Sequence, residues 1–505
     1  MKVLNQENKK TFRKPDLFLI FVLTVLIVTN QLVVPLNSYF SQDDFYHLRQ
    51  IMDKKVADLP IFFLPAITSE QTFYRPLSRE IYNFITFSLF GLSPLPYHLI
   101  ILLFIFIIGL LMFKLILVFS KSNQAAIVGT ALYYLSAIHS TELYYTASVE
   151  NLITTLFSLL TIIFYLYFFN NKKKRYYFLS LGSYLFTVGS HESSIVLLPM
   201  LITIHFFWIK QIYKIRLNKL IMIFLPFVLV TIYRIFIFLA IMHLPKQIEY
   251  QADFNPKVML NSFIWLVLWI FNLPEFLVDF VTFSFKINPN LIKWYGSYLI
   301  IVIPLIIVQL TIVIISVIQL KGRLLRYKDL LFFISLFLLA IAPLTIFPSH
   351  KFSYYLSQSS VWIYAAVGSL FAHLTAYKPK FRIFSYLFII AFSITSIQTV
   401  NINALTHWAA KRDVAAEFLI KDIKSKYPTV VKGTIFYIVN NPQYPVISPE
   451  WGSSSKQAFY ILSGADAFKL IYHDNSIRTY FEDVTGLPED IDLDKIIVYQ
   501  PLFPY

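Results

Sequence analysis

The stretch WYGSYLIIVIPLIIVQLTIVIISVIQL, residues 294–320, contains no Asp, Glu, Lys or Arg. A helix of about 20 apolar residues is long enough to cross the ~30 Å hydrocarbon core of a bilayer. Uncharged runs of similar length recur at residues 17–37, 151–171 and 352–376. One such run could be a buried core helix. Repeated runs of this length are typical of a protein that crosses the membrane many times.

The overall composition supports this interpretation. Of the 505 residues, 57% are hydrophobic and only 14% are charged, whereas soluble domains carry about a quarter charged residues. The chain has no cysteine, which excludes a disulfide framework and thiolate metal sites. Its formal charge of +15 comes from short loops between the apolar runs, and no basic patch with interleaved aromatic residues indicates nucleic-acid binding.

The apolar runs predict about eleven transmembrane helices. Residues 17–37 are too long for a signal peptide and are not followed by a small-residue cleavage site, so we expect a retained first span. Basic clusters such as 172–175 and 321–328 then fall on the cytoplasmic side together with the N-terminus, as the positive-inside rule requires. The predicted spans after the first cover residues 97–119, 125–139, 152–169, a hairpin over 176–208, 220–243, 296–320, 330–347, 354–376 and 383–404.

One apolar segment does not fit this alternation. Residues 258–285 could cross once, but that crossing would invert the rest of the chain, and Pro274 interrupts the segment. We therefore expect a re-entrant or interfacial pair that lines a cavity, because broken backbone at membrane depth must be covered by protein or water.

The last part of the chain has a different composition. Residues 407–505 predict a small extracytoplasmic α/β domain, with strands at 433–439 and 495–499 and a helix at 455–471. The expected division is a membrane domain over 1–406, whose first outer loop covers 38–80, followed by this C-terminal domain. The predicted protein is thus an α-helical polytopic membrane protein of the plasma membrane.

Two adjacent carboxylates follow the first span. Asp43 and Asp44 lie in the sequence SQDDFYHLR, residues 41–49, at the expected water interface. A carboxylate held beside a hydroxyl can act as its general base, and a second one can orient the acceptor, raise the pKa of the first, or help to hold a divalent cation. The alternative is a solvated loop start or a helix cap, positions that Asp favours.

Several further ionisable residues map to the same face of the membrane. Arg75 could bind a phosphate through its planar fork, or could extend along the interface. Arg234 lies inside a span, where an ionisable side chain usually marks a site. The remaining members are His191 and Glu192 at a hairpin tip, and His350 and Lys351 before a late span. A lipid-phosphate-linked sugar is the donor we expect at this face, and its departing phosphate would need such cations.

The order of these motifs resembles the GT-C superfamily of polyprenyl-phosphate-dependent membrane glycosyltransferases, which includes the protein O-mannosyltransferases. The motifs that carry the resemblance are Asp43-Asp44, Tyr74-Arg75-Pro76-Leu77, the stretch LFGLSP at 89–94 with Tyr97-His98, Ser190-His191-Glu192, and His350-Lys351 with Tyr354-Tyr355. Together they extend over most of the membrane part.

The resemblance implies a GT-C fold and an inverting transfer. Asp43 or Asp44 would be the general base and, if a metal is used, its ligand; a divalent cation is the one cofactor considered. The carrier phosphate would bind to Arg75, His350 and Lys351, and we add Arg234 to this group. Residues expected to support the cavity are His47, Tyr74, His191, Glu192 and Tyr354.

Two departures from the family pattern concern the site and the acceptor. His191 replaces the usual basic residue at the hairpin tip, and the chain lacks the tetratricopeptide repeats of the closest eukaryotic relatives. A protein acceptor is therefore not implied, and lipid or glycan acceptors stay open. The short α/β tail is closer to prokaryotic members.

Two other functions fit parts of the pattern. A transporter or flippase of lipid-linked saccharides would also need a polar cavity, but such proteins often contain inverted repeats with matching broken helices, and the sequence shows one broken segment and no repeat. A polysaccharide polymerase or ligase would share the chemistry and differ in its acceptor.

Overall fold

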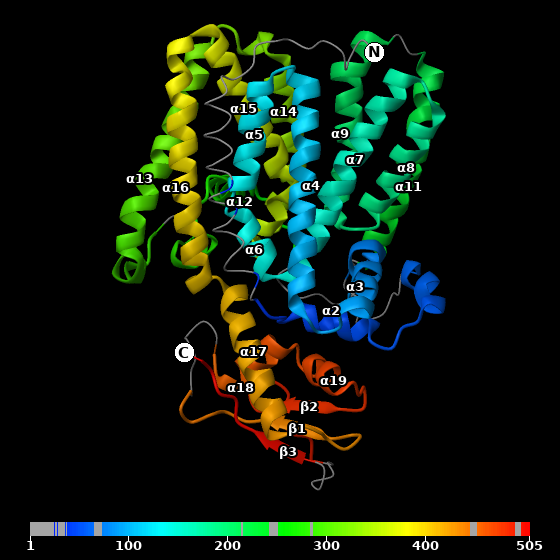
Figure 1. Ribbon diagram of the computed structural model, residues 1–505, viewed down its shortest axis with the longest axis vertical. Coiled ribbons are helices and arrows are strands. Elements are labelled where there is room, and N and C mark those ends of the chain that lie inside the picture. The colour runs from blue at the N-terminus through cyan, green and yellow to red at the C-terminus, as the bar shows by residue number, and fades with distance from the viewer. Residues whose placement is uncertain are drawn as a thin grey trace.

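The computed structural model describes residues 25, 28, 36, 38–64, 73–213, 216–241, 251–282, 286–444, 452–489 and 496–504. The predicted first span, residues 17–37, therefore lies almost entirely outside the described residues. Figure 1 shows a bundle of long helices, with a smaller part that contains helices and strands at one of its ends. The short helix α2 (Asp43–Ile51) lies between the two.

The bundle consists of α4 to α16. Eight helical stretches of the described chain are long and apolar enough to cross a membrane, so the protein is an integral membrane protein. The helix bounds are α4 Pro94–Ser120, α5 Asn123–Leu135, α6 Ile138–Tyr144, α7 Val149–Asn171, α8 Lys174–Val188, α9 Leu197–Ile204, α10 Lys210–Ile212, α11 Leu217–Ile241, α12 Pro256–Ile270, α13 Pro289–Leu320, α14 Lys328–Ile341, α15 Ser357–Tyr377 and α16 Arg382–Thr406.

The eight stretches correspond to eight of the predicted spans. The predicted span 125–139 and the first span of the hairpin predicted over 176–208 fold as α5 and α8, which have 13 and 15 residues. At 1.5 Å per residue they are shorter than the hydrocarbon core, so the expected total of about eleven crossings stays a prediction.

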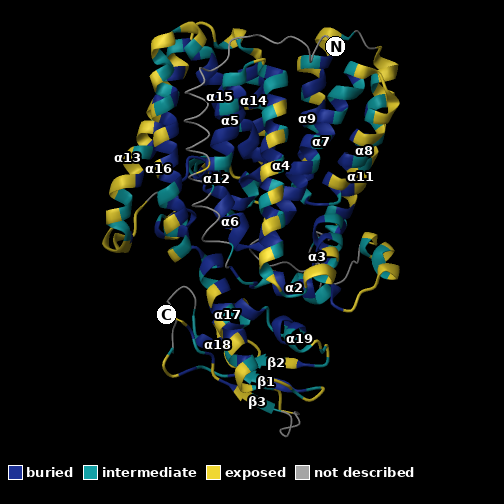
Figure 2. Ribbon diagram, in the orientation of Figure 1, coloured by how far each residue is buried: buried dark blue, intermediate teal, exposed yellow. Residues whose placement is uncertain are grey.

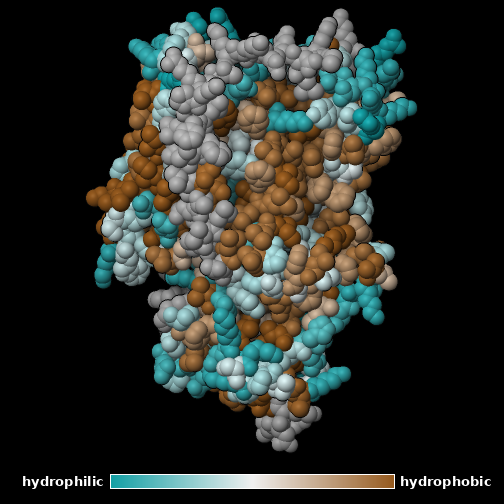
Figure 3. All heavy atoms as spheres, viewed as in Figure 1, coloured by the Kyte–Doolittle hydropathy of each residue, from teal (hydrophilic) through white to brown (hydrophobic). Residues whose placement is uncertain are grey.

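The exposure of each helix follows from its residues. In the most apolar 18-residue stretch of each helix, 78% of the residues are buried for α15, 28% for α13 and 22% for α11. Long apolar side chains therefore cover the outside of the bundle, which Figure 3 shows as a broad hydrophobic surface. At the centre, Gly368 of α15 lies so close to α5 that an added Cβ would be 2.4 Å from the carbonyl oxygen of Ala125. Small residues thus allow these two backbones to approach closely.

The broken segment at 258–285 forms α12, a tight turn and the short helix η8 (Glu275–Phe280). Asn272 makes the turn with a φ of 64°. Its side chain accepts a hydrogen bond from the backbone N–H of Ala137 at 2.8 Å and donates to the carbonyl of Phe392 at 3.2 Å. Protein groups therefore cover the broken backbone here. The re-entrant or interfacial arrangement of α12 and η8 stays a prediction.

The C-terminal part begins with α17 (Trp408–Lys426) and contains a parallel three-stranded sheet in the order β2-β1-β3. The central strand β1 (Ile435–Ile438) and the edge strand β3 (Ile496–Tyr499) lie within the two predicted strands. The sequence analysis missed β2 (Arg478–Phe481). A boundary at residue 406 or 407 stays a prediction.

The single helix predicted at 455–471 is wrong. The chain forms α18 (Ser454–Leu462) and α19 (Asp466–Tyr472) instead. Ser463 and Gly464 between them have φ values of 54° and 60°, a left-handed conformation that ends a helix and that glycine adopts without strain.

Helix α2 is attached to the C-terminal part. Phe40, Phe45 and Leu48 belong to one buried hydrophobic cluster with side chains of α17, α18 and α19. The guanidinium Nε of Arg49 donates to a carboxylate oxygen of Asp466 in α19 at 2.7 Å. The position of α2, and of the acidic pair at its start, therefore depends on residues more than 350 positions away in sequence.

Candidate functional site

The two adjacent carboxylates at the start of α2 have different environments. Asp43 is exposed, whereas Asp44 is only 2% exposed. Asp44 accepts hydrogen bonds from the Thr146 hydroxyl and the Ala147 backbone N–H, both at 2.7 Å, and from the Ser41 N–H at 3.1 Å. Burial nevertheless raises the pKa of Asp44 to about 7. Asp44 thus fixes the turn η4 (Thr146–Ser148) against α2.

A divalent cation does not fit this carboxylate pair. Both carboxylate oxygens of Asp44 already face N–H or O–H donors, whereas a cation would need their lone pairs. Among the described residues there is no group of three or more His, Asp or Glu arranged to hold a metal ion. The side chains therefore do not favour the cation considered from sequence.

Asp43 has a different partner. The hydroxyl of Tyr145 donates a hydrogen bond to its Oδ2. The Tyr145 ring lies 5.7 Å from the ring of Tyr354 and 5.1 Å from that of Trp408. Asp43 is the accessible member of the pair, held by one donor and flanked by aromatic rings. This arrangement suits a base that must meet an acceptor hydroxyl.

The arginines meet two carboxylates, the buried Glu150 and the partly buried Glu192. Arg75 binds Glu192 through Nη2 at 2.7 Å and through Nε at 2.9 Å, and its Nη1 binds Glu150. Arg234 of α11 binds the other oxygen of Glu192 at 2.7 Å and donates to the carbonyl of Tyr74. The neighbouring carboxylates Glu150 and Glu192 hold the pKa of Arg75 well above its usual range, against the opposing effect of its burial.

Backbone contacts explain why these distant residues meet. Arg75 precedes the short helix η3 (Pro76–Ile81), which docks on the turn between α8 and η5 (Glu192–Val196). The Leu77 N–H donates to the carbonyl of Gly189 at 3.2 Å, and the Ser78 hydroxyl donates to the carbonyl of Ser190 at 2.6 Å. Gly189 permits this approach, because a Cβ there would lie 2.8 Å from the Leu77 side chain.

A cavity of about 380 Å³ opens beside this ion-pair cluster. Its volume lies in the range of small-molecule sites. Charged and polar residues are among those that line it, but most of the accessible wall is apolar and comes from α11, the loop at 252–254 and η10 (Ala342–Ile346). Five of the residues predicted from sequence line it: Arg75, His191, Glu192, Arg234 and His350.

His350 lines the cavity as a neutral group. Its Nε2 forms a hydrogen bond with the Tyr355 hydroxyl at 2.7 Å. Burial, with a smaller contribution from Arg75, lowers the pKa of His350 to about 4. The imidazole is therefore uncharged near pH 7, and it can contribute a hydrogen bond to a phosphate but not the positive charge expected from sequence.

The remaining predicted residues lie outside the cavity wall. Lys351 follows His350 but does not line the cavity, and burial lowers its pKa. Tyr74 contributes its carbonyl to Arg234. Tyr354 lies between Tyr145 and Tyr355, with ring centroids 5.7 and 4.7 Å away and the ring planes tilted. Since Tyr355 lines the cavity, a row of three tyrosines in ring contact extends from Asp43 to it.

His47 lies on α2, one helical turn after Asp43. Burial lowers the pKa of His47 well below its usual value, and the nearby guanidinium groups of Arg79 and Arg75 lower it further. His47 also lines a cavity together with Arg79 and Glu80.

Two residues of the site were missed by the sequence analysis. Glu150 could have been found from sequence, because it directly precedes the uncharged run at 151–171. An ionisable residue at the end of a span is a candidate for a site. Tyr145 gave no such signal, because tyrosines are frequent throughout this chain.

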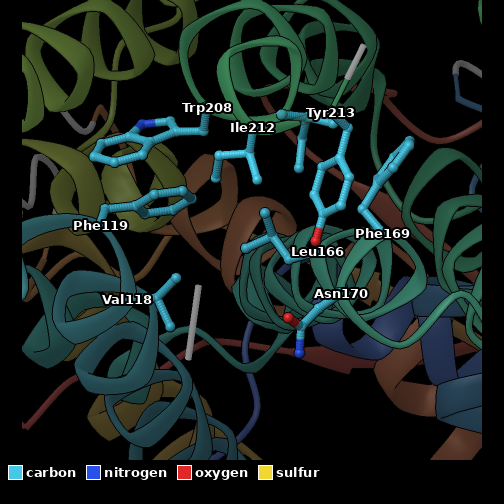
Figure 4. A pocket seen from close by; sticks show the side chains of 9 residues that line it. Val118, Phe119, Leu166, Phe169, Asn170, Trp208, Ile212 and Tyr213 are labelled. Atoms are coloured by element: carbon cyan, nitrogen blue, oxygen red, sulfur yellow. The ribbon is translucent and has the colours of Figure 1, made fainter. Parts of the chain in front are cut away.

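A second cavity, between α4, α7 and the short helix η6 (His205–Ile209), is much smaller. Figure 4 shows its side chains, among them Phe119 and Trp208, whose ring centroids are 5.4 Å apart. Its volume is about 20 Å³, enough for about one water molecule. It is a packing gap and not a candidate site.

Comparison with known proteins leaves the family open. No protein-family model and no curated protein matches the chain. Among solved structures, the chain is similar to the archaeal oligosaccharyltransferase AglB from Archaeoglobus fulgidus in complex with an inhibitory peptide and a dolichol-phosphate. The identity is 12% and the TM-score 0.43, and the match covers 92% of this chain and 64% of that chain. Because these values are low, the function is inferred from the side chains alone.

Proposed function

We propose that the protein is an inverting glycosyltransferase of the GT-C type, which moves a sugar from a polyprenyl-phosphate carrier to an acceptor at the outer face of the membrane. The observation that carries this proposal is the cavity of about 380 Å³, whose largely apolar wall ends at Arg75 and Arg234. A polyprenyl phosphate has the matching chemistry, with an apolar chain and an anionic head.

The ion pairs favour binding of the carrier phosphate. Glu150 and Glu192 engage Nε, Nη1 and Nη2 of Arg75. A guanidinium has five N–H donors, so two are left for phosphate oxygens. The carboxylates hold the fork in place before the phosphate arrives, which reduces the reorganisation that binding requires. Arg234 supplies the second cation, and His350 a neutral hydrogen-bonding group.

The proposed reaction is a single displacement. Asp43 removes the proton from an acceptor hydroxyl, and the hydroxyl oxygen forms a bond to the anomeric carbon of the sugar. The bond from that carbon to the phosphate oxygen breaks, and its electron pair leaves with the phosphate, whose charge Arg75 and Arg234 stabilise. One displacement from the opposite face inverts the anomeric configuration. The proton ends on Asp43.

The acidic pair provides the test of this proposal. The purified protein is reconstituted in vesicles with radiolabelled polyprenyl-phosphate hexoses and pentoses, and loss of sugar from the carrier is measured. We expect Asp43→Asn to lower turnover by about 100-fold or more, with binding of polyprenyl phosphate nearly unchanged. Glu489→Gln, an exposed change in the C-terminal part, is the matched control.

Two outcomes would contradict the proposal. If Asp43→Asn and Asp44→Asn both keep full turnover, neither carboxylate is the base. If the labelled sugar crosses the bilayer still attached to its carrier phosphate and is never released, the protein is a transporter of lipid-linked saccharides.

A further inference from the structure

A separate cavity of about 310 Å³ lies beside α2. Its wall comes from α2, from η2 (Val56–Phe63) and from η3, the helix that follows Arg75. Two residues of its wall are close in the structure to the proposed base Asp43 and to Arg75. His47 on its wall lies one helical turn after Asp43, and the N–H of Arg79 donates to the carbonyl of Arg75 at 3.0 Å.

The inner part of this cavity is polar and charged. Arg79 is only 8% exposed, donates to the carbonyl of Phe73 at 2.8 Å, and pairs with Glu80. The second oxygen of Glu80, Oε2, is buried and has no hydrogen-bond partner among the described residues. A buried polar atom without a hydrogen-bond partner destabilises the folded protein. A hydroxyl group in this cavity would satisfy it.

The outer part of the cavity is apolar and continues onto an exposed surface. Ile61 and Leu64 line the cavity and are 53% and 65% exposed. Phe62, between them, also lines it, and its ring lies 6.2 Å from that of Phe84 in α3 (Tyr82–Phe90). Figure 1 shows η2, in dark blue, projecting sideways beyond α3, and Figure 2 shows much of it exposed. Exposed apolar side chains beside the helix bundle, as on η2, suit the interface of a bilayer.

We propose that this cavity binds the acceptor, and that the acceptor is an amphiphile of the outer leaflet with a hydroxylated headgroup. The headgroup would occupy the polar part, with a hydroxyl donating to Glu80 and its reacting hydroxyl toward Asp43, and the apolar part would lie along η2. The inference rests on the proposed function. It adds that the carrier and the acceptor enter through different cavities, the first lined by Arg75 and the second by α2, η2 and η3.

The absence of cysteine permits a direct test, because a single introduced cysteine can be modified selectively. Gln50→Cys places a thiol on the wall of the cavity, where N-ethylmaleimide would occupy the space of the headgroup. Lys55→Cys, exposed and outside the wall, is modified in the same way as the control. Glu80→Gln keeps the size of that side chain and removes its charge.

The assay uses vesicles of phosphatidylethanolamine, phosphatidylglycerol and a monoglycosyl diacylglycerol, with the labelled carrier and, in the aqueous phase, a Ser/Thr peptide and a soluble oligosaccharide. We expect the label in a new lipid-extractable product. Modified Gln50→Cys and Glu80→Gln should lower that transfer at least about tenfold, while binding of polyprenyl phosphate changes less than about twofold. Modified Lys55→Cys should behave as the unmodified protein.

Two results would overturn the inference about the acceptor. One is transfer of the label to the peptide or the soluble oligosaccharide; the other is undiminished transfer to lipid after Gln50→Cys is modified. Failure of the proposed function is distinguishable from both, because the unmodified protein would then release no sugar from the carrier to any acceptor, nor to water.

Discussion

Tyr145 and Asp43 are 102 positions apart in sequence, and the hydroxyl of the first donates a hydrogen bond to the carboxylate of the second. The contact exists because Asp44, the neighbour of Asp43, binds the turn that follows Tyr145. One carboxylate therefore fixes the backbone, and the other is held in a defined orientation by Tyr145.

Replacement of Tyr145 tests this positioning. We expect Tyr145→Phe to lower kcat about tenfold, since an unoriented base loses part of its contribution, and to leave the KM for the carrier unchanged. The measurement is steady-state release of sugar from the carrier. Tyr144→Phe is the matched control, because the buried Tyr144 hydroxyl has no hydrogen-bond partner among the described residues. Equal kcat values for the two variants would contradict the assignment.

The pH dependence of stability tests the buried state of Asp44. Its folded pKa of about 7 lies above the value of about 3.9 in an unfolded chain, so the folded protein binds this proton more tightly. The resulting stabilisation is fully present below about pH 4 and is lost as the pH rises through 7. We expect the Tm in detergent to fall between pH 5 and pH 8, and to fall less in Asp44→Asn.

The control for this measurement is Glu489→Gln, which should retain the decrease in Tm of the unmodified protein. Asp413 of α17, buried nearby with a pKa raised to about 8 by its burial, should account for much of the decrease that remains in Asp44→Asn. An identical decrease in Asp44→Asn and in the unmodified protein would show that Asp44 does not titrate in this range.

The bridging role of Arg75 predicts that lysine cannot replace it. A single ammonium cannot bind Glu150, Glu192 and a phosphate with the geometry of a planar fork. We expect Arg75→Lys to weaken binding of polyprenyl phosphate about 10- to 100-fold, since hydrogen bonds to charged groups contribute about 1.5–3 kcal/mol. Isothermal titration in detergent measures this, and Arg323→Lys, far from the cavity in sequence and exposed, is the control.

The close contact between α5 and α15 predicts that alanine destabilises the protein at one glycine and not at another. In Gly368→Ala the new Cβ would meet the backbone of Ala125 and Gly129, which cannot move aside as a side chain can. We expect the free energy of unfolding to fall by about 1–3 kcal/mol, which would be seen as a lower Tm. Gly182 of α8 has open space at the same position, so Gly182→Ala should leave the Tm unchanged or raise it, because alanine favours a helix. Equal effects on the Tm would contradict the close packing at Gly368.

Much of the membrane part could be predicted from sequence because its signal is local. A run such as 294–320 has no charge over its whole length, and a membrane helix satisfies its backbone hydrogen bonds within itself. The same holds for β1 and β3, whose apolar runs predict strands, although only β1 is largely buried. The break between α18 and α19 was missed, because left-handed φ values at Ser463 and Gly464 depend on how the two helices pack.

The sequence by itself determined a polytopic membrane chain, an acidic pair after the first apolar run, and the cationic residues Arg75 and Arg234. Only the tertiary structure decided that Asp44 is buried while Asp43 is accessible, that Glu150 joins the arginine cluster, and that Lys351 lies outside the cavity wall. The physical reason is that hydropathy acts along the chain, whereas burial, ion pairing and cavity shape arise from helices that are distant in sequence and meet only in the folded protein.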